Sequence, residues 1–160
     1  MVYVVICGVL LGVFILKFKD ELNERSSYKT IKKQRSILAD IYDDLTQMFY
    51  FQKPGKFIGP LEPLNNLNIL NNLVMVEDNE SYTINKKIIH LCTKNPQNGQ
   101  YYDKNTLMFV VLHELAHVLC NDVGHTENFS IINQSLLDHA IKCGFYDPSK
   151  PFVKNYCSLN

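Results

Sequence analysis

The sequence lacks an excess of charge of either sign. Its 160 residues carry 16 lysines and arginines against 16 aspartates and glutamates, so the formal net charge is zero. A balanced chain produces no overall field that would concentrate nucleic acid, and no local basic patch stands out. We therefore expect no nucleic-acid partner.

The sequence also lacks close cysteine pairs, internal repeats and long low-complexity tracts. Its five cysteines have none of the framework spacing of disulfide-rich secreted domains: Cys7, Cys92, Cys120, Cys143 and Cys157. We predict free thiols, as is typical of a cytosolic protein. Apolar residues make up 46% of the chain, and a chain of this length has room for one modest core and one domain.

One long apolar run is present, at the N-terminus. Val2 to Leu16 carries no charged residue and is followed by Lys17 and Lys19, whose long side chains can reach the lipid headgroups. A span needs roughly 17 to 25 residues, so we predict a short transmembrane anchor at 1–19 and one domain at 20–160. The alternatives are a buried core helix and a cleaved signal peptide, although the basic n-region and small-residue cleavage site of a signal peptide are missing.

Basic residues flank this apolar run on its C-terminal side alone. The positive-inside rule then leaves the short N-terminus outside and the domain in the cytosol, as in a single-pass membrane protein. Three glycosylation sequons would matter only in a lumenal domain, and they begin at Asn79, Asn128 and Asn133.

Hydrophobic periodicity divides the domain into helices and strands. It predicts helices over 26–52, 107–120 and 127–142, strands over 82–84 and 88–93, and a turn near Asn85-Lys86. Residues 56–76, rich in asparagine, indicate only loops and short helices. The helix over 107–120 is apolar on nearly every face, which is typical of a central helix, and Asn105 or Thr106 is its expected N-cap. This order of elements predicts an α+β fold.

The central helix contains the segment HELAH at 113–117. His113 and His117 lie one turn apart on the same face, and neutral imidazole is a good zinc ligand. Glu114 lies beside such a metal without occupying a ligand position, where it can act as general base on a zinc-activated water. The alternative is an ordinary core, but burying a carboxylate and two imidazoles without partners is costly. The segment therefore predicts a hydrolytic zinc site.

A catalytic zinc usually takes three protein ligands and leaves a fourth position open. His125 is our first candidate for the third ligand, because Gly124 can adopt the left-handed conformation that turns the chain back after the helix. Asp138 or His139 on the following helix is the alternative, and a site with no third ligand is the remaining one.

The segment HELAHVLCNDVGHTENF resembles the zinc peptidase group that includes the WLM and SprT-like families. Their pattern is H-E-x-x-H, then a histidine after a variable loop, then a phenylalanine; here these positions are His113, Glu114, His117, His125 and Phe129. Most of residues 81–157 further resembles small membrane-anchored WLM-like proteins encoded by large DNA viruses.

The resemblance implies a zincin-like metallopeptidase domain, with the zinc-binding helix beside a small sheet whose edge strand, about 87–93, lines the cleft for a protein or peptide substrate. The group also includes DNA-dependent proteases, but this sequence has no separate DNA-binding or SUMO-binding module. One alternative is a non-catalytic membrane-anchored binding module, in which Cys120 or Cys143 closes a structural zinc site. Metal-assisted hydrolysis of a non-peptide amide is another.

Overall fold

The computed structural model describes residues 36–50 and 55–157. The predicted anchor at 1–19, Cys7 and the ends of the helix predicted over 26–52 lie outside these residues. The chain divides into two units, Met1–Ser36 and Ile37–Asn160, and the fold below is that of the second. Within the described ranges, no helix has both the length and the apolar character needed to cross a bilayer.

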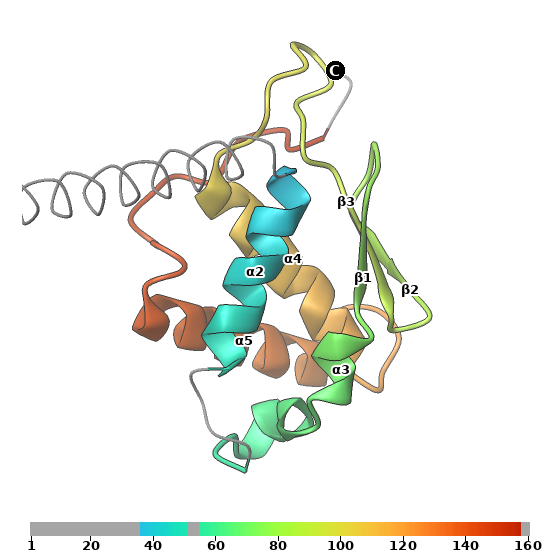
Figure 1. The fold of residues 1–160 in the computed structure, drawn as a ribbon, viewed down its shortest axis with the longest axis vertical. Helices are drawn as coiled ribbons and strands as arrows, with labels where there is room; N and C mark the ends of the chain where they lie inside the picture. The colour runs from blue at the N-terminus through green and yellow to red at the C-terminus, as the bar shows by residue number, and fades with distance from the viewer. Residues whose placement is uncertain (1–35, 51–54, 158–160) are drawn as a thin grey trace, which may run out of the picture. The chain divides into compact units, whose positions relative to one another are not determined.

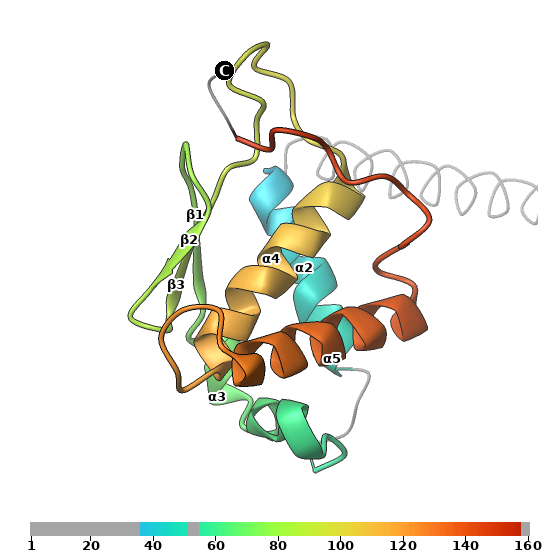
Figure 2. The same ribbon diagram turned by 180° about the vertical axis from the view of Figure 1, so that it is seen from behind.

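Among the described residues, three long helices and two short ones make up the helical part of the domain (Figure 1). The long helices are α2 (Ile37–Tyr50), α4 (Lys104–Leu119) and α5 (Glu127–Cys143). The short ones, η1 (Gly59–Asn65) and α3 (Asn68–Asn71), fall in the region where the sequence indicated loops and short helices. In both views α2 lies beside α4, and α5 crosses the end of α4 (Figure 2).

The sheet has three strands, β1 (Val74–Glu77), β2 (Tyr82–Ile84) and β3 (Ile88–Leu91), in the order β1-β3-β2. β1 runs parallel to β3, and β2 runs antiparallel to it. The turn expected near Asn85-Lys86 is confirmed, since both residues have positive φ and the Lys87 N–H donates to the Ile84 carbonyl. Helices and a small mixed sheet together confirm the α+β class.

The expected edge strand is wrong. β3 pairs on both sides and is therefore the central strand, whereas β2 has a single neighbour and lies at an edge. The resemblance to the zinc peptidase group implied that edge position. The structure instead pairs β1, the short run VMVE, with the other side of β3. β3 presents Ile89 and Leu91, both fully buried, to the helices.

α4 is the central helix, as predicted, with buried residues around most of its circumference: Thr106, Leu107, Met108, Val110, Val111, Leu112, Glu114, Leu115, Ala116 and Leu119. Its N-cap is Asp103, and not Asn105 or Thr106, because the Asp103 carboxylate accepts a hydrogen bond from the Thr106 N–H at 3.0 Å. This contact satisfies one of the unpaired N–H groups at the helix start.

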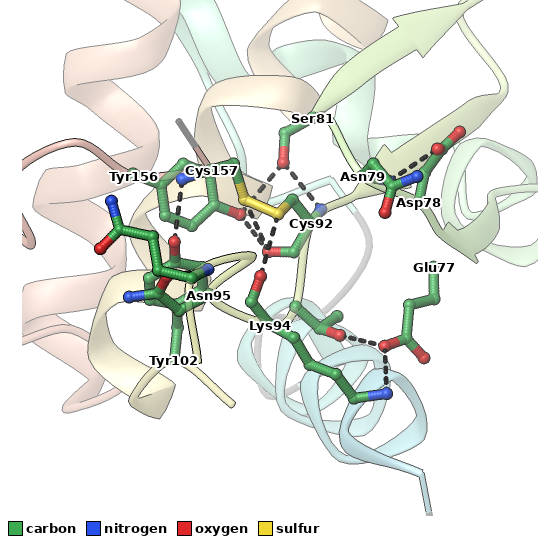
Figure 3. The surroundings of a disulfide bond; sticks show 12 residues. Glu77, Asp78, Asn79, Ser81, Cys92, Lys94, Asn95, Tyr102, Tyr156 and Cys157 are labelled. Atoms are coloured by element: carbon green, nitrogen blue, oxygen red, sulfur yellow. Dashed lines mark hydrogen bonds and ion pairs between the residues drawn. A yellow bond between two sulfur atoms is a disulfide. The ribbon is translucent and has the colours of Figure 1, made fainter. Parts of the chain in front are cut away.

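Cys92 and Cys157 form a disulfide (Figure 3). The prediction of free thiols is therefore wrong for these two residues, while Cys120 and Cys143 are free. The partners are 65 residues apart in sequence, and they meet because the C-terminal segment runs from α5 past the N-terminal end of α4 to the end of β3 (Figure 2). Cysteine spacing does not reveal such a return, and the cysteines no longer favour the cytosol.

Candidate metal centre

Three histidines converge at the C-terminal half of α4. His113 and His117 come from the helix, and His125 comes from the loop that follows it. The Nε2 atom of His125 lies 3.1 Å from that of His113 and 3.2 Å from that of His117. Among the described residues, no other group of three potential metal ligands brings its donor atoms so close together.

The spacing of these nitrogens fits a metal ion. Two imidazole nitrogens bound to zinc at 2.0 to 2.1 Å with tetrahedral angles lie about 3.4 Å apart. The observed separations of 3.1 and 3.2 Å are close to that value. Neutral imidazoles carry only one N–H each, so three nitrogens aimed at one point satisfy one another poorly, whereas one cation uses all three lone pairs. The donor set therefore suits zinc.

The loop between α4 and α5 is built to present His125. Gly124 has φ +82°, the left-handed conformation expected for it. Thr126 is the N-cap of α5, and its hydroxyl accepts from the Phe129 N–H and donates to the Asp122 carboxylate at 2.8 Å. His125 thus lies between a glycine turn and a capped helix start, which fixes its backbone opposite α4.

Phe129 forms the floor of the site. Its ring centroid lies 5.0, 4.2 and 4.8 Å from those of His113, His117 and His125, respectively. The side chain is only 3% exposed. One aromatic ring therefore supports all three imidazoles and keeps water from their inner side.

This environment keeps the imidazoles neutral. Burial lowers the pKa of His113 to about 4, with further lowering from His117 and His125. Burial also lowers the pKa of His117, with smaller effects of the same sign from His125 and Lys86. Neutral imidazole is the form that binds a metal, so at pH 7 these two residues need not lose a proton to do so.

Glu114 is buried beside the histidines, with a residue exposure of 5%. Its Oε2 accepts a hydrogen bond from the Thr83 hydroxyl of β2 at 2.8 Å, and the same hydroxyl lies 3.1 Å from the Glu114 carbonyl oxygen. Burial raises the pKa of Glu114, while the Thr83 hydrogen bond and the nearby His125 oppose that rise. A carboxylate with a raised pKa is a stronger base than an exposed one.

The alternative third ligands lie elsewhere on α5. Asp138 accepts a hydrogen bond from Gln134, and His139 stacks on Phe49 with its Nε2 3.3 Å from the Met48 carbonyl oxygen. His139 therefore packs against α2 and not against His113. Of the predicted candidates, only His125 joins the pair on α4.

The cysteines expected to close a structural site also point to other partners. The Cys120 sulfur accepts from the Asn128 amide, and the Cys143 sulfur lies 3.6 Å from His139 Nε2. Neither belongs to the three-histidine group. Within the described residues, the group has three ligands, of which His125 is exposed.

Sequence reasoning missed the two contacts that tie the β2–β3 hairpin to α4. Thr83 binds Glu114, and the Lys86 ammonium donates to the Cys120 carbonyl at the end of the helix. The alternation in Tyr82-Thr83-Ile84 was the available signal, because it places Thr83 on the opposite face from its two neighbours. No local pattern indicates that this face meets a glutamate.

Comparison with known proteins gives viral relatives. The chain is 59% identical over 159 residues to the "Uncharacterized protein 042R" of invertebrate iridescent virus 3, covering 99% of this chain and 100% of the relative. The chain belongs to the family of this viral protein. A second member, protein 136R of invertebrate iridescent virus 6, is 55% identical over 141 residues, covering 84% of this chain and 79% of the relative.

A more distant relative of this iridescent virus family is protein R325 of Acanthamoeba polyphaga mimivirus. It is 34% identical over 142 residues, covering 81% of this chain and 66% of the relative. No family model and no solved structure matches the chain. The relatives agree with the expected viral character, but their names state no activity, so membership of the zinc peptidase group stays a prediction.

Proposed function

We propose that the protein is a zinc-dependent metallopeptidase in which His113, His117 and His125 hold the metal and Glu114 is the general base. The observation that carries the proposal is the convergence of three imidazole Nε2 atoms beside a buried carboxylate. Three ligands with an open side are typical of catalytic zinc, whereas structural zinc usually has four protein ligands.

The side chains have separate roles in peptide hydrolysis. Zinc bound at the histidines would polarise the substrate carbonyl and lower the pKa of a water molecule. Glu114 accepts the proton of the attacking water and returns it to the leaving amine. The Thr83 hydroxyl holds the carboxylate in one orientation at 2.8 Å, and Phe129 excludes water from the inner side of the imidazoles.

The position of β2 supports a protein or peptide substrate. An exposed strand edge can bind an extended peptide through main-chain hydrogen bonds. β2 lies at an edge of the sheet, and its central residue contacts Glu114. A peptide added along β2, rather than along 87–93 as the resemblance implied, would lie next to the general base.

Membrane attachment through 1–19 is the second part of the proposal. It rests on the apolar run and its basic flank. The three histidines lie within the unit Ile37–Asn160, and attachment would restrict the peptidase to substrates near a membrane surface.

Zinc content and peptide cleavage of His125→Ala test the metallopeptidase proposal, with His139→Ala as a matched control from the neighbouring helix. We expect one zinc per chain and chelator-sensitive cleavage in the wild type and in His139→Ala, and loss of both in His125→Ala. One zinc in all three proteins without any cleavage would favour a structural site in a binding module. If the protein cleaves non-peptide amides but no peptide, the result would favour metal-assisted hydrolysis of a non-peptide amide.

A further inference from the structure

The C-terminal tail is joined by the disulfide to Cys92, directly after β3, and by a polar contact to Ser81, directly before β2 (Figure 3). The Tyr156 hydroxyl donates to the Cys92 carbonyl and shares a hydrogen bond with the Ser81 hydroxyl at 3.0 Å. The Ser81 hydroxyl in turn accepts from the Cys92 N–H at 3.0 Å. Ser81, Cys92 and Tyr156 therefore form one network directly before the first residue of β2.

Contacts with the rest of the domain hold the backbone of residues 155–157 in its conformation. Asn155 and Cys157 both have positive φ, at 56° and 54°, which non-glycine residues rarely adopt unless the surroundings impose it. The Cys157 N–H donates to the Tyr102 hydroxyl at 2.9 Å, and the rings of Tyr102 and Tyr156 are 4.7 Å apart. The disulfide is the covalent contact among those that hold this segment.

Ser81 of this network lies two residues before Thr83, which contacts the proposed general base Glu114. Ser81 is fixed by the tail, and Thr83 on β2 holds the Glu114 carboxylate. β2 is only three residues long and pairs on one side. β2 is otherwise held by its pairing with β3, by the stacking of Tyr82 on His90 at 4.4 Å and by the contact of Lys86 with Cys120. Ser81 is the contact that holds the N-terminal end of the strand, two residues before Thr83.

We propose that the Cys92–Cys157 disulfide, through Tyr156 and Ser81, positions β2 and the Thr83 hydroxyl, so that hydrolysis at the histidine site depends on the oxidation state of this cysteine pair. This inference rests on the proposed metallopeptidase function. Reduction by a dithiol transfers two electrons and two protons to the disulfide: Cys92 and Cys157 become thiols, and the dithiol becomes a disulfide. The histidines lie on α4 and its following loop, so the zinc ligands stay in place.

Two measurements on the full-length chain test the coupling. The first is kcat, KM and zinc content for the oxidised wild type, the dithiol-reduced wild type and Cys157→Ser. Loss of one oriented hydrogen bond changes a rate by about fivefold, so we expect kcat to fall by about that factor with KM and zinc content unchanged. Cys143→Ser, a free cysteine on α5, is the matched control and should match wild type in both redox states.

The second measurement is amide hydrogen exchange at 81–84 in metal-free protein, which needs no activity. Exchange should become faster on reduction and in Cys157→Ser, and stay unchanged in Cys143→Ser. Tyr156→Phe keeps the disulfide and removes the hydroxyl, so it should also speed exchange; it replaces Cys157→Ser if that variant does not fold. Thr83→Val should lower kcat, and Thr83→Ser should restore it.

The outcomes separate the coupling from the peptidase itself. An oxidised wild type that holds zinc but cleaves no peptide refutes the proposed function, whatever the exchange data show. Cleavage and exchange at 81–84 that are equal in oxidised wild type, reduced wild type and Tyr156→Phe refute the coupling and leave the peptidase intact.

Discussion

A buried carboxylate needs a reason to stay in the core, and Glu114 has two. Its hydrogen bond from Thr83 offsets part of the desolvation cost, and it lies beside three histidines that could hold a cation. A residue at position 114 that served only to fill the core would not need a carboxylate beside Thr83 or beside the histidines. The burial of Glu114 thus favours a chemical role over a structural one.

Glu114→Gln tests that role. The amide keeps the size of the side chain and can still accept from Thr83, but it does not take up a proton, so we expect bound zinc to be retained. General base catalysis contributes typically 10² to 10⁴-fold, and kcat should fall by about that factor. Zinc content and steady-state cleavage measure the two effects. A variant with wild-type kcat would remove Glu114 from the mechanism.

Tyr156 gives a pH-dependent prediction at the same scale. Burial raises the pKa of its hydroxyl to about 12, with the Ser81 hydrogen bond opposing and Tyr102 and Glu114 adding to the rise. The folded state therefore keeps this proton more tightly than the unfolded chain, whose tyrosine pKa is about 10. Stability from Tyr156 is present below pH 10 and is lost as the pH rises towards 12, by about 2 kcal/mol after allowance for solvent screening.

Denaturant unfolding of wild type and Tyr156→Phe between pH 8 and 12 measures this contribution. The free energy of unfolding of the wild type should fall more steeply above pH 10 than that of the variant. If the unfolding free energies of wild type and Tyr156→Phe change in parallel with pH, the Tyr156 hydroxyl has the same pKa in the folded and unfolded states.

At the scale of elements, the start of α4 governs the helix that carries the site. Asp103→Ala removes the carboxylate that accepts from the Thr106 N–H, and loss of an N-cap costs about 0.5 to 2 kcal/mol. Asp103→Asn retains a capping oxygen and serves as the control. Chemical unfolding should rank the stabilities as wild type, then Asn, then Ala. If Ala and Asn are equally stable, the cap contributes nothing measurable.

The elements also show what the sequence could predict. Local signals predicted three of the elements, α4, α5 and β2. The i,i+4 histidine pair and the glycine turn likewise predicted the site residues: His113, Glu114, His117 and His125. β1, the edge position of β2 and the contact of Thr83 with Glu114 depend on which segments meet in space. Periodicity describes each segment alone, and the same limit concealed the pairing of Cys92 with Cys157.

For the whole molecule, the flanking charges and the disulfide favour different compartments. Seven lysines and arginines lie between 17 and 35, directly after the apolar run, and the positive-inside rule predicts a cytosolic domain from them. Disulfides favour an oxidising compartment, and cytosolic ones are usually transient, catalytic or redox-sensing. The two observations agree if the disulfide is a redox-responsive element on the cytosolic side, where the proposed coupling to β2 would let it change activity.

Glycosylation of the full-length chain in eukaryotic cells tests this orientation. Asn79 and Asn128 begin sequons and are exposed, so a lumenal domain would be glycosylated there. We expect no glycosylation, because the positive-inside rule predicts a cytosolic domain. Replacing the basic residues between 17 and 35 with glutamine is the matched control, and it should yield a glycosylated fraction that Asn79→Gln/Asn128→Gln reduces. A glycosylated wild type would place the disulfide in the lumen and make it a permanent structural bond, without any role in sensing redox state.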